Sequence, residues 1–217
     1  LKNFEYIIYD GMSDDGTKLA VRKYLNKNIK YICKHDKNYY EGLNYAMSKA
    51  TGDYIGILNA GDIYCNSGIL KKIFNVTSLC KYEILFGNLI YRDDKNNSVR
   101  FWKFPIKKLT YFSALKIASP TLFIKKKLVK LNPYNVSYSI SADTDFNLRL
   151  SEKKFKFLYL NYNIIFMRTG GLSTNYKFFL AKMKQDLIIL KFFFKITFSI
   201  VYLYKILIKL RTYKLNF

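Results

Sequence analysis

Short apolar runs alternate with amphipathic stretches over the first 62 residues, and this alternation constrains the fold more than any other feature of the chain. We expect strands at residues 4–9, 29–33 and 54–58, and helices running to about residue 25 and over residues 39–49. Strands and helices that alternate through short links are typical of βαβ units and of a mostly parallel sheet. The sequence therefore predicts an α/β protein with helices flanking the sheet.

The middle of the chain has a different pattern. Its expected elements are a hairpin of residues 84–91 and 99–103, a strand at 121–124, a helix over 140–152, and strands at 155–160 and 164–167. These segments are short and follow one another without a linker rich in proline or serine. They therefore continue the same domain, which we expect to cover residues 1–175.

Three carboxylates come directly after the first three expected strands. They are Asp10, Asp36 and Asp62. Each one alone is more often a turn or capping residue, since Asp favours both positions. Together they indicate a cleft, because ligands collect at the carboxyl ends of strands in an open α/β sheet. A carboxylate such as Asp62 suits a divalent cation, which in turn suits a diphosphate.

The chain is strongly basic, with 37 Lys and Arg against 15 Asp and Glu and a formal charge of +22. Such a field attracts an anionic partner, whether nucleic acid, acidic lipid or a phosphorylated substrate. Nucleic acid is the weakest of these interpretations, because many of the basic residues lie on a C-terminal stretch that is otherwise apolar. Three cysteines without paired spacing do not indicate a disulfide framework or a zinc site.

Residues 176–217 form a separate compositional block with nine basic residues and one acid. If the block is one helix turning about 100° per residue, six lysines fall within a single arc, opposite apolar bulk. These lysines are Lys177, Lys184, Lys191, Lys195, Lys205 and Lys209. We expect an amphipathic helix lying in a membrane interface. The alternatives are a core-packed helix with a solvated lysine face and, less favoured because lysines are costly inside a bilayer, a membrane span.

Four ordered blocks of sequence resemble family 2 glycosyltransferases of the GT-A fold. Residues 6–17 read YIIYDGMSDDGT, 36–44 read DKNYYEGLN, and 50–62 read ATGDYIGILNAGD. The fourth block joins SADTDFNLR at 141–149 to GGLS at 170–173. The second, third and fourth are most similar to the branch that makes colanic acid and other surface polysaccharides. Members of the family normally begin with an earlier strand, so we expect this chain to lack that strand.

The resemblance implies roles for particular residues. Asp10 and Asp36, with Gly61, match positions that bind the nucleotide sugar, and Asp62 matches the last carboxylate of the metal-binding motif, which implies Mn²⁺ or Mg²⁺ as cofactor. Asp143 matches the general base of inverting members. Asp145 and Arg149 match the acceptor side, although their i,i+4 spacing favours a structural ion pair slightly more.

The leading interpretation is an inverting glycosyltransferase of surface polysaccharide biosynthesis. It would move a sugar from a nucleotide-diphosphate donor to a glycan or lipid-linked acceptor. We expect it in the cytoplasm, peripheral on the inner face of the cell membrane, where anionic lipid attracts the basic C-terminal block. The alternative is a truncated, non-catalytic GT-A remnant that binds membrane or a partner.

Overall fold

The computed structural model describes residues 4–79, 81–170 and 176–213. Most of the GGLS block lies outside these residues. The strands are β1 (Tyr6–Asp10), β2 (Ile29–Cys33), β3 (Tyr54–Gly56), β4 (Ile63–Tyr64), β5 (Ile84–Arg92), β6 (Ser98–Trp102), β7 (Phe123–Lys125) and β8 (Phe157–Arg168). The α-helices are α1 (Thr17–Arg22), α2 (Tyr39–Lys49), α3 (Ile69–Thr77), α4 (Tyr111–Ala114), α5 (Lys126–Leu131), α6 (Ala142–Ser151), α7 (Phe179–Phe194) and α8 (Phe198–Leu210). The mixture of strands and helices confirms the predicted α/β class.

The sheet is mixed, which corrects the expectation of a mostly parallel one. β1 and β2 form a parallel pair, and the six-stranded sheet runs β3-β7-β5-β8-β4 with β6 also paired to β5. Within the six-stranded sheet only β5 and β8 are parallel in the described residues. For β5 and β6 the connection explains the direction, because their short turn can join only antiparallel strands, whereas a parallel pair needs a longer crossover.

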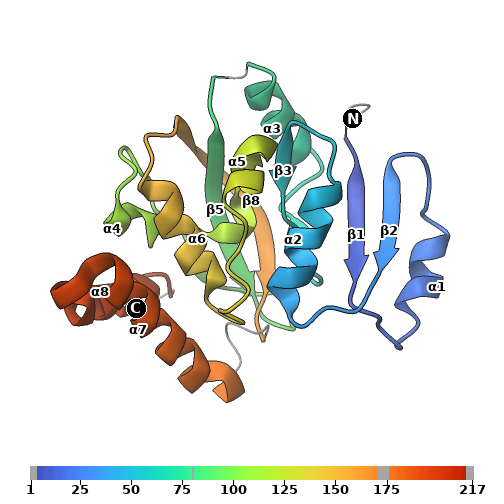
Figure 1. Cartoon of the computed structure of the whole chain (residues 1–217). Helices are drawn as coiled ribbons and strands as arrows, with labels where there is room; N and C mark the ends of the chain where they lie inside the picture. The colour runs from blue at the N-terminus through green and yellow to red at the C-terminus, as the bar shows by residue number, and fades with distance from the viewer. Residues whose placement is uncertain (1–3, 80, 171–175, 214–217) are drawn as a thin grey trace.

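β5 is the centre of the fold, and its first seven residues are all buried. Its side chains alternate between two apolar clusters: Leu85 and Leu89 belong to one, and Ile84 and Phe86 to the other. The second cluster is covered by α2, α5 and α6, which lie together across one face of the sheet (Figure 1). Alternation of this kind places one strand in contact with two layers of helices.

The helix α2 begins and ends where the sequence predicted. Asn38 caps it, because its side chain accepts hydrogen bonds from the backbone N–H groups of Tyr40 and Glu41. Its side-chain oxygen therefore satisfies two of the unpaired donors of the first turn. The buried phenol of Tyr40 donates to the backbone oxygen of Ile140 at 3.0 Å. This contact joins α2 to the chain just before α6.

The C-terminal block forms two helices instead of the single helix we expected. Lys195, with φ of 48°, interrupts the helix between α7 and α8, and α8 packs against α7 (Figure 1). The break rotates the residues beyond it relative to α7, so the predicted stripe of six lysines does not form: Lys205 is buried. Ile189, Val201 and other residues of these helices join the core cluster around β5.

One buried ion pair fixes the position of α7 and α8. The Nζ atom of Lys205 lies 2.8 Å from Oδ1 of Asp186 and also donates to Oγ1 of Thr144 in α6 at 2.8 Å. Burial alone would raise the pKa of Asp186, but attraction to Lys205 and the neighbouring lysines lowers it overall. The pair therefore holds α7, α8 and α6 together.

We predict that Asp186→Ala destabilises the protein by about 3–5 kcal/mol, because it leaves the ammonium group of Lys205 buried without its counter-ion. Urea unfolding measures the change. The double variant Asp186→Leu, Lys205→Met should recover most of the loss, and Lys191→Met on the exposed face of α7 serves as the control. A loss below 1 kcal/mol in Asp186→Ala, or no recovery in the double variant, would contradict the role of the pair.

Candidate active site

A cavity of about 580 Å³ lies where the ends of several elements meet. Polar groups enter it from every side. Those that bear on the chemistry are Tyr39, Asn59, Asp62, Tyr91, Arg100, Asp143, Thr144, Arg168, Lys182, Lys205 and Lys209. Two of the predicted site residues, Asp62 and Asp143, are therefore brought to one cavity from positions 81 residues apart in the sequence.

Asp62 is held in the turn that follows β3. Gly61, just before it, has φ of 84°, a conformation that favours glycine, and the N–H of Asp62 donates to the backbone oxygen of Asn59 at 3.0 Å. The Nδ2 atom of Asn59 donates to Oδ2 of Asp62 at 3.0 Å, and the hydroxyl of Tyr39 donates to Oδ1 of Asn59 at 2.6 Å. This chain of hydrogen bonds orients the carboxylate toward the cavity.

The carboxylate of Asp62 has no ion-pair partner among the described residues, although the residue is only 8% exposed. Burial raises its pKa to about 6, and the hydrogen bond from Asn59 offsets part of that effect. No cluster of three His, Cys, Asp or Glu side chains that would hold a metal occurs in the described parts of the chain. A cation would therefore fit here only with ligands from a bound diphosphate, which is a mode that Mg²⁺ commonly uses.

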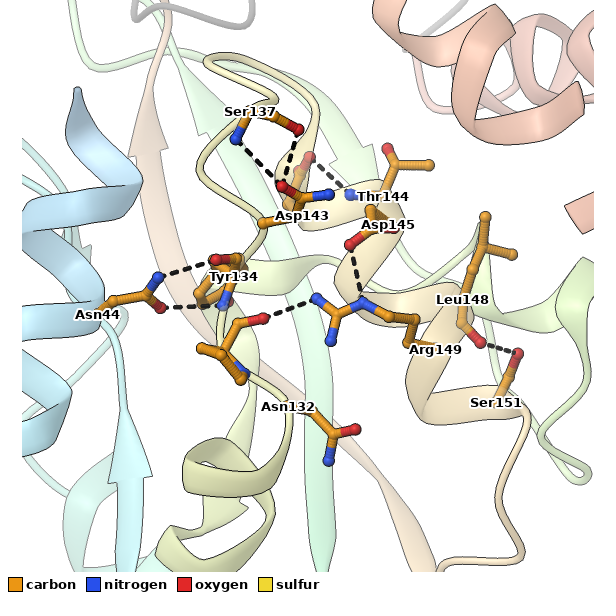
Figure 2. Close-up of polar contacts among 12 residues, drawn as sticks. Asn44, Asn132, Tyr134, Ser137, Asp143, Thr144, Asp145, Leu148, Arg149 and Ser151 are labelled. Atoms are coloured by element: carbon orange, nitrogen blue, oxygen red, sulfur yellow. Dashed lines mark hydrogen bonds and ion pairs between the residues drawn. The ribbon is translucent and has the colours of Figure 1, made fainter. Parts of the chain in front are cut away.

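Asp143 stands at the first helical turn of α6, as Figure 2 shows. The backbone N–H of Thr144 donates to its Oδ1 at 2.8 Å, which fixes one carboxylate oxygen and leaves Oδ2 for another partner. The side chain is half-buried at the cavity wall. It is thus placed to accept a proton from a hydroxyl group bound in the cavity.

Asp10 and Asp36 lie together but do not line this cavity. A Cβ atom on Gly11, next to Asp10, would lie 3.1 Å from Oδ2 of Asp36, and one on Gly42 would lie 2.8 Å from it. Hydrogen bonds from Ser13 and Tyr31 lower the pKa of Asp10. The expectation that the two carboxylates share one cleft with Asp62 is therefore wrong for this cavity, and their nucleotide-binding role stays a prediction.

Asp145 and Arg149 form the i,i+4 ion pair that was the favoured alternative, with Nε 2.8 Å from Oδ2. Arg149 also donates to the backbone oxygen of Pro133 at 2.8 Å, along the side of α6 (Figure 2). Neither residue lines the cavity. The structure therefore offers no geometric support for placing them on the acceptor side.

Sequence reasoning missed several residues of the cavity wall. Arg100 comes from β6, where a single basic residue in an edge strand gives no signal of function. Lys182, Lys205 and Lys209 come from the C-terminal helices. The sequence did contain one indication that a lysine of residues 176–217 is buried, namely the one acid of this block, Asp186. A lone carboxylate among basic residues is a natural partner for a buried lysine such as Lys205.

The architecture is that of the GT-A glycosyltransferases. Staphylococcus aureus TarS 1-349, solved in complex with UDP, is similar over 88% of this chain and 57% of that structure, with a TM-score of 0.64 and 16% identity. The mannosyltransferase PcManGT from Pyrobaculum calidifontis, in complex with GDP-Man and Mn²⁺, gives a TM-score of 0.58 over 85% of this chain and 52% of that one, with 14% identity. These likenesses concern the fold.

The family model for glycosyl transferase family 2 matches residues 1–138, and the chain belongs to that family. A glycosyltransferase of Methanocaldococcus jannaschii is 26% identical over 72% of this chain and 57% of the relative. A PGL/p-HBAD biosynthesis glycosyltransferase of Mycobacterium tuberculosis is 27% identical over 68% of this chain and 58% of the relative. The chain thus spans somewhat more than half the length of these relatives. Its assignment to the surface-polysaccharide branch stays a prediction.

We predict that Asp62→Asn stabilises the protein at pH 8 by about 1–2 kcal/mol in the absence of divalent cations, after allowing for solvent screening in the cavity. Because burial raises the pKa of Asp62 to about 6, its ionisation opposes folding. The gain should therefore appear as pH rises from about 4 through 6 and be absent below that range.

Thermal or urea unfolding at pH 4.5 and pH 8 measures this dependence. The matched control is Asp53→Asn, an exposed carboxylate beside β3 whose substitution should leave the pH profile unchanged. Equal stability of Asp62→Asn and the parent protein at pH 8 would contradict the prediction that ionisation of Asp62 opposes folding.

Proposed function

We propose that this family 2 chain is an inverting glycosyltransferase that transfers a sugar from a nucleotide-diphosphate donor to a glycan or lipid-linked acceptor in surface polysaccharide biosynthesis. One observation carries the proposal: Asp62 and Asp143 line the same cavity. A carboxylate that could hold a cation for the leaving diphosphate, and a second one that could take the proton of the acceptor hydroxyl, are groups with which an inverting displacement can proceed. The nucleotides bound by TarS and PcManGT support the choice of donor class.

In this proposal Asp143 is the general base. Its Oδ2 takes the proton of the acceptor hydroxyl while the acceptor oxygen forms a bond to the anomeric carbon. The bond from that carbon to the diphosphate oxygen breaks, and its electron pair leaves with the nucleotide. The hydrogen bond from the N–H of Thr144 keeps the carboxylate in one orientation throughout.

Asp62 would hold the donor end of the cavity. Its carboxylate is buried and has no ion-pair partner among the described residues, so it suits a cation that also binds a diphosphate. This fit supports Mn²⁺ or Mg²⁺ as cofactor. When bound, that cation would offset the charge that develops on the leaving diphosphate. Asp10, Asp36 and the turn at Gly61 would bind the nucleotide portion of the donor.

We further propose that α7 and α8 rest on the cytoplasmic surface of the membrane. The region Phe179–Leu210 is long and apolar enough to cross a membrane by length and composition alone, and only 17% of its most apolar window is buried. Phe192, Ile196 and Ile200 are 75%, 95% and 70% exposed. The break at Lys195 and the ion pair to the core favour a surface orientation over a span.

The test of catalysis uses Asp143→Asn. Release of UDP or GDP from a panel of nucleotide sugars, with membrane extract as acceptor source, should fall at least about 100-fold, because a general base commonly contributes that much. Binding of the nucleotide should be unchanged. Glu152→Gln, at the other end of the same helix, is the matched control.

In the same assay, chelator and Asp62→Ala should each abolish release. Full turnover by Asp143→Asn would show that this residue is not the general base. Full turnover in the presence of chelator would show that the reaction needs no divalent metal. A protein that binds neither UDP nor GDP and releases no nucleotide would instead be the non-catalytic remnant.

The membrane role predicts that the triple variant Phe192→Ser, Ile196→Ser, Ile200→Ser loses most of its binding to phosphatidylglycerol vesicles, since each substitution removes apolar surface from the interface. Vesicle flotation with the full chain measures this. Leu131→Ser, at a site 73% exposed on α5, is the control and should float with the vesicles. Undiminished flotation of the triple variant would rule out this face as the contact.

A further inference from the structure

The C-terminal helices place cationic side chains in the wall of the cavity. Lys182 comes from α7, and Lys205 and Lys209 come from α8 at i,i+4 spacing, which puts both on one side of that helix. Arg100 of β6 enters the same wall. A cavity wall that holds these four cationic side chains, with Arg168 as a fifth, is built to receive negative charge, unless each cation already has a partner.

Of these five, Arg168 pairs with Asp94, and among the described residues only Lys205 of the other four has a carboxylate partner. Its ammonium group contacts Asp186 and Thr144. Neither Lys182 nor Lys209 takes part in an ion pair among the described residues. Burial lowers the pKa of Lys209 to about 8, and repulsion from Lys205 and Lys182 adds to the effect. An anion placed among these lysines would relieve that repulsion.

Arg100 provides independent evidence for an anionic ligand. The residue is 7% exposed, and its guanidinium carbon lies 4.6 Å from the ring centre of Tyr91 and 4.9 Å from that of Tyr213. Its Nε donates to the hydroxyl of Thr212, but Nη2 is buried without a hydrogen-bond partner. A fixed, stacked guanidinium with an unused donor is the arrangement in which arginine recognises phosphate or carboxylate.

The lysines adjoin Asp143 rather than Asp62. The negative charge of Asp143 favours the charged form of both Lys205 and Lys209. Lys205 also donates a hydrogen bond to Thr144, the residue next to Asp143. The groups that act on the ionisation of Asp62 are instead Asn59 and the backbone of Arg168. The contact of Lys205 with Thr144 therefore places the lysines of the cluster beside the base, on the side where the acceptor hydroxyl would bind.

We infer that Arg100, Lys182 and Lys209 form a phosphate-binding subsite for the acceptor, so that the acceptor is a molecule carrying a phosphate or diphosphate close to its reacting hydroxyl. The assignment of this phosphate to the acceptor rests on the proposed function. The existence of the anion subsite rests on the geometry alone.

The test titrates inorganic phosphate and decyl phosphate into the full chain by calorimetry. Binding of both should weaken at least about tenfold in Arg100→Gln and in Lys209→Gln, because each loses a charge-assisted hydrogen bond. Lys103→Gln, just past the end of β6, and Lys184→Gln, on the exposed side of α7, should bind as the parent does. Lys209 takes part in no ion pair among the described residues, so its variant removes none and remains informative if Arg100→Gln fails to fold.

A second set of titrations adds saturating UDP or GDP with Mn²⁺. Retained phosphate binding supports the acceptor assignment, whereas competition by the nucleotide would assign the cluster to the donor and overturn it. Equal binding by all variants would overturn the subsite itself. If neither nucleotide binds, the proposed function fails while the variants still decide the subsite. If decyl phosphate binds more tightly than inorganic phosphate, and this binding is lost in Lys209→Gln, the subsite takes a phosphate carried on a lipid. If the two bind with equal affinity, the subsite takes the phosphate of a soluble acceptor.

Discussion

The buried pair of Lys205 and Asp186 is the interaction on which the arrangement of the site depends. Two ions removed from water are stable only in close contact, because each one alone carries a large desolvation penalty. Since Lys205 also bonds to Thr144, the pair sets the C-terminal helices at a fixed distance from the turn of α6 that carries Asp143. The lysines of the cavity wall and the proposed base are therefore positioned by the same contact.

Uncompensated charges of opposite sign face this one cavity. Among the described residues Asp62 is buried without an ion-pair partner, and the guanidinium of Arg100 is buried with an unused donor. The two would stabilise each other if they could meet, but the turn after β3 holds the first and stacking on Tyr91 holds the second. A scaffold that keeps such groups apart leaves each free for a ligand of its own, which under our proposals would be a cation with its diphosphate at Asp62 and an anion at Arg100.

The sequence predicted the parts of the fold that local patterns control. The bounds of β2 and α2 agree with the predicted ones, because an isolated apolar run and an Asn-capped helix are determined by neighbouring residues. Asp62 and Asp143, to which the family resemblance gave roles, line one cavity, whereas Asp10 and Asp36, which we expected to share a cleft with Asp62, do not line it. The break at Lys195 and the inward orientation of Lys205 were missed, since both arise from packing between helices that no periodicity in one helix records.

The two faces of α8 connect the membrane proposal to the cavity. Lys205 and Lys209 point toward the site, while Leu203, Leu207 and Leu210 are exposed. If the exposed side rests on lipid, the lysines lie within one helix diameter of the bilayer surface, about 10 Å. A phosphate attached to a lipid would reach that depth without leaving the membrane plane. The same helix would then serve both to dock the protein and to receive the charged group of its acceptor, so the basic residues need not all contact the membrane.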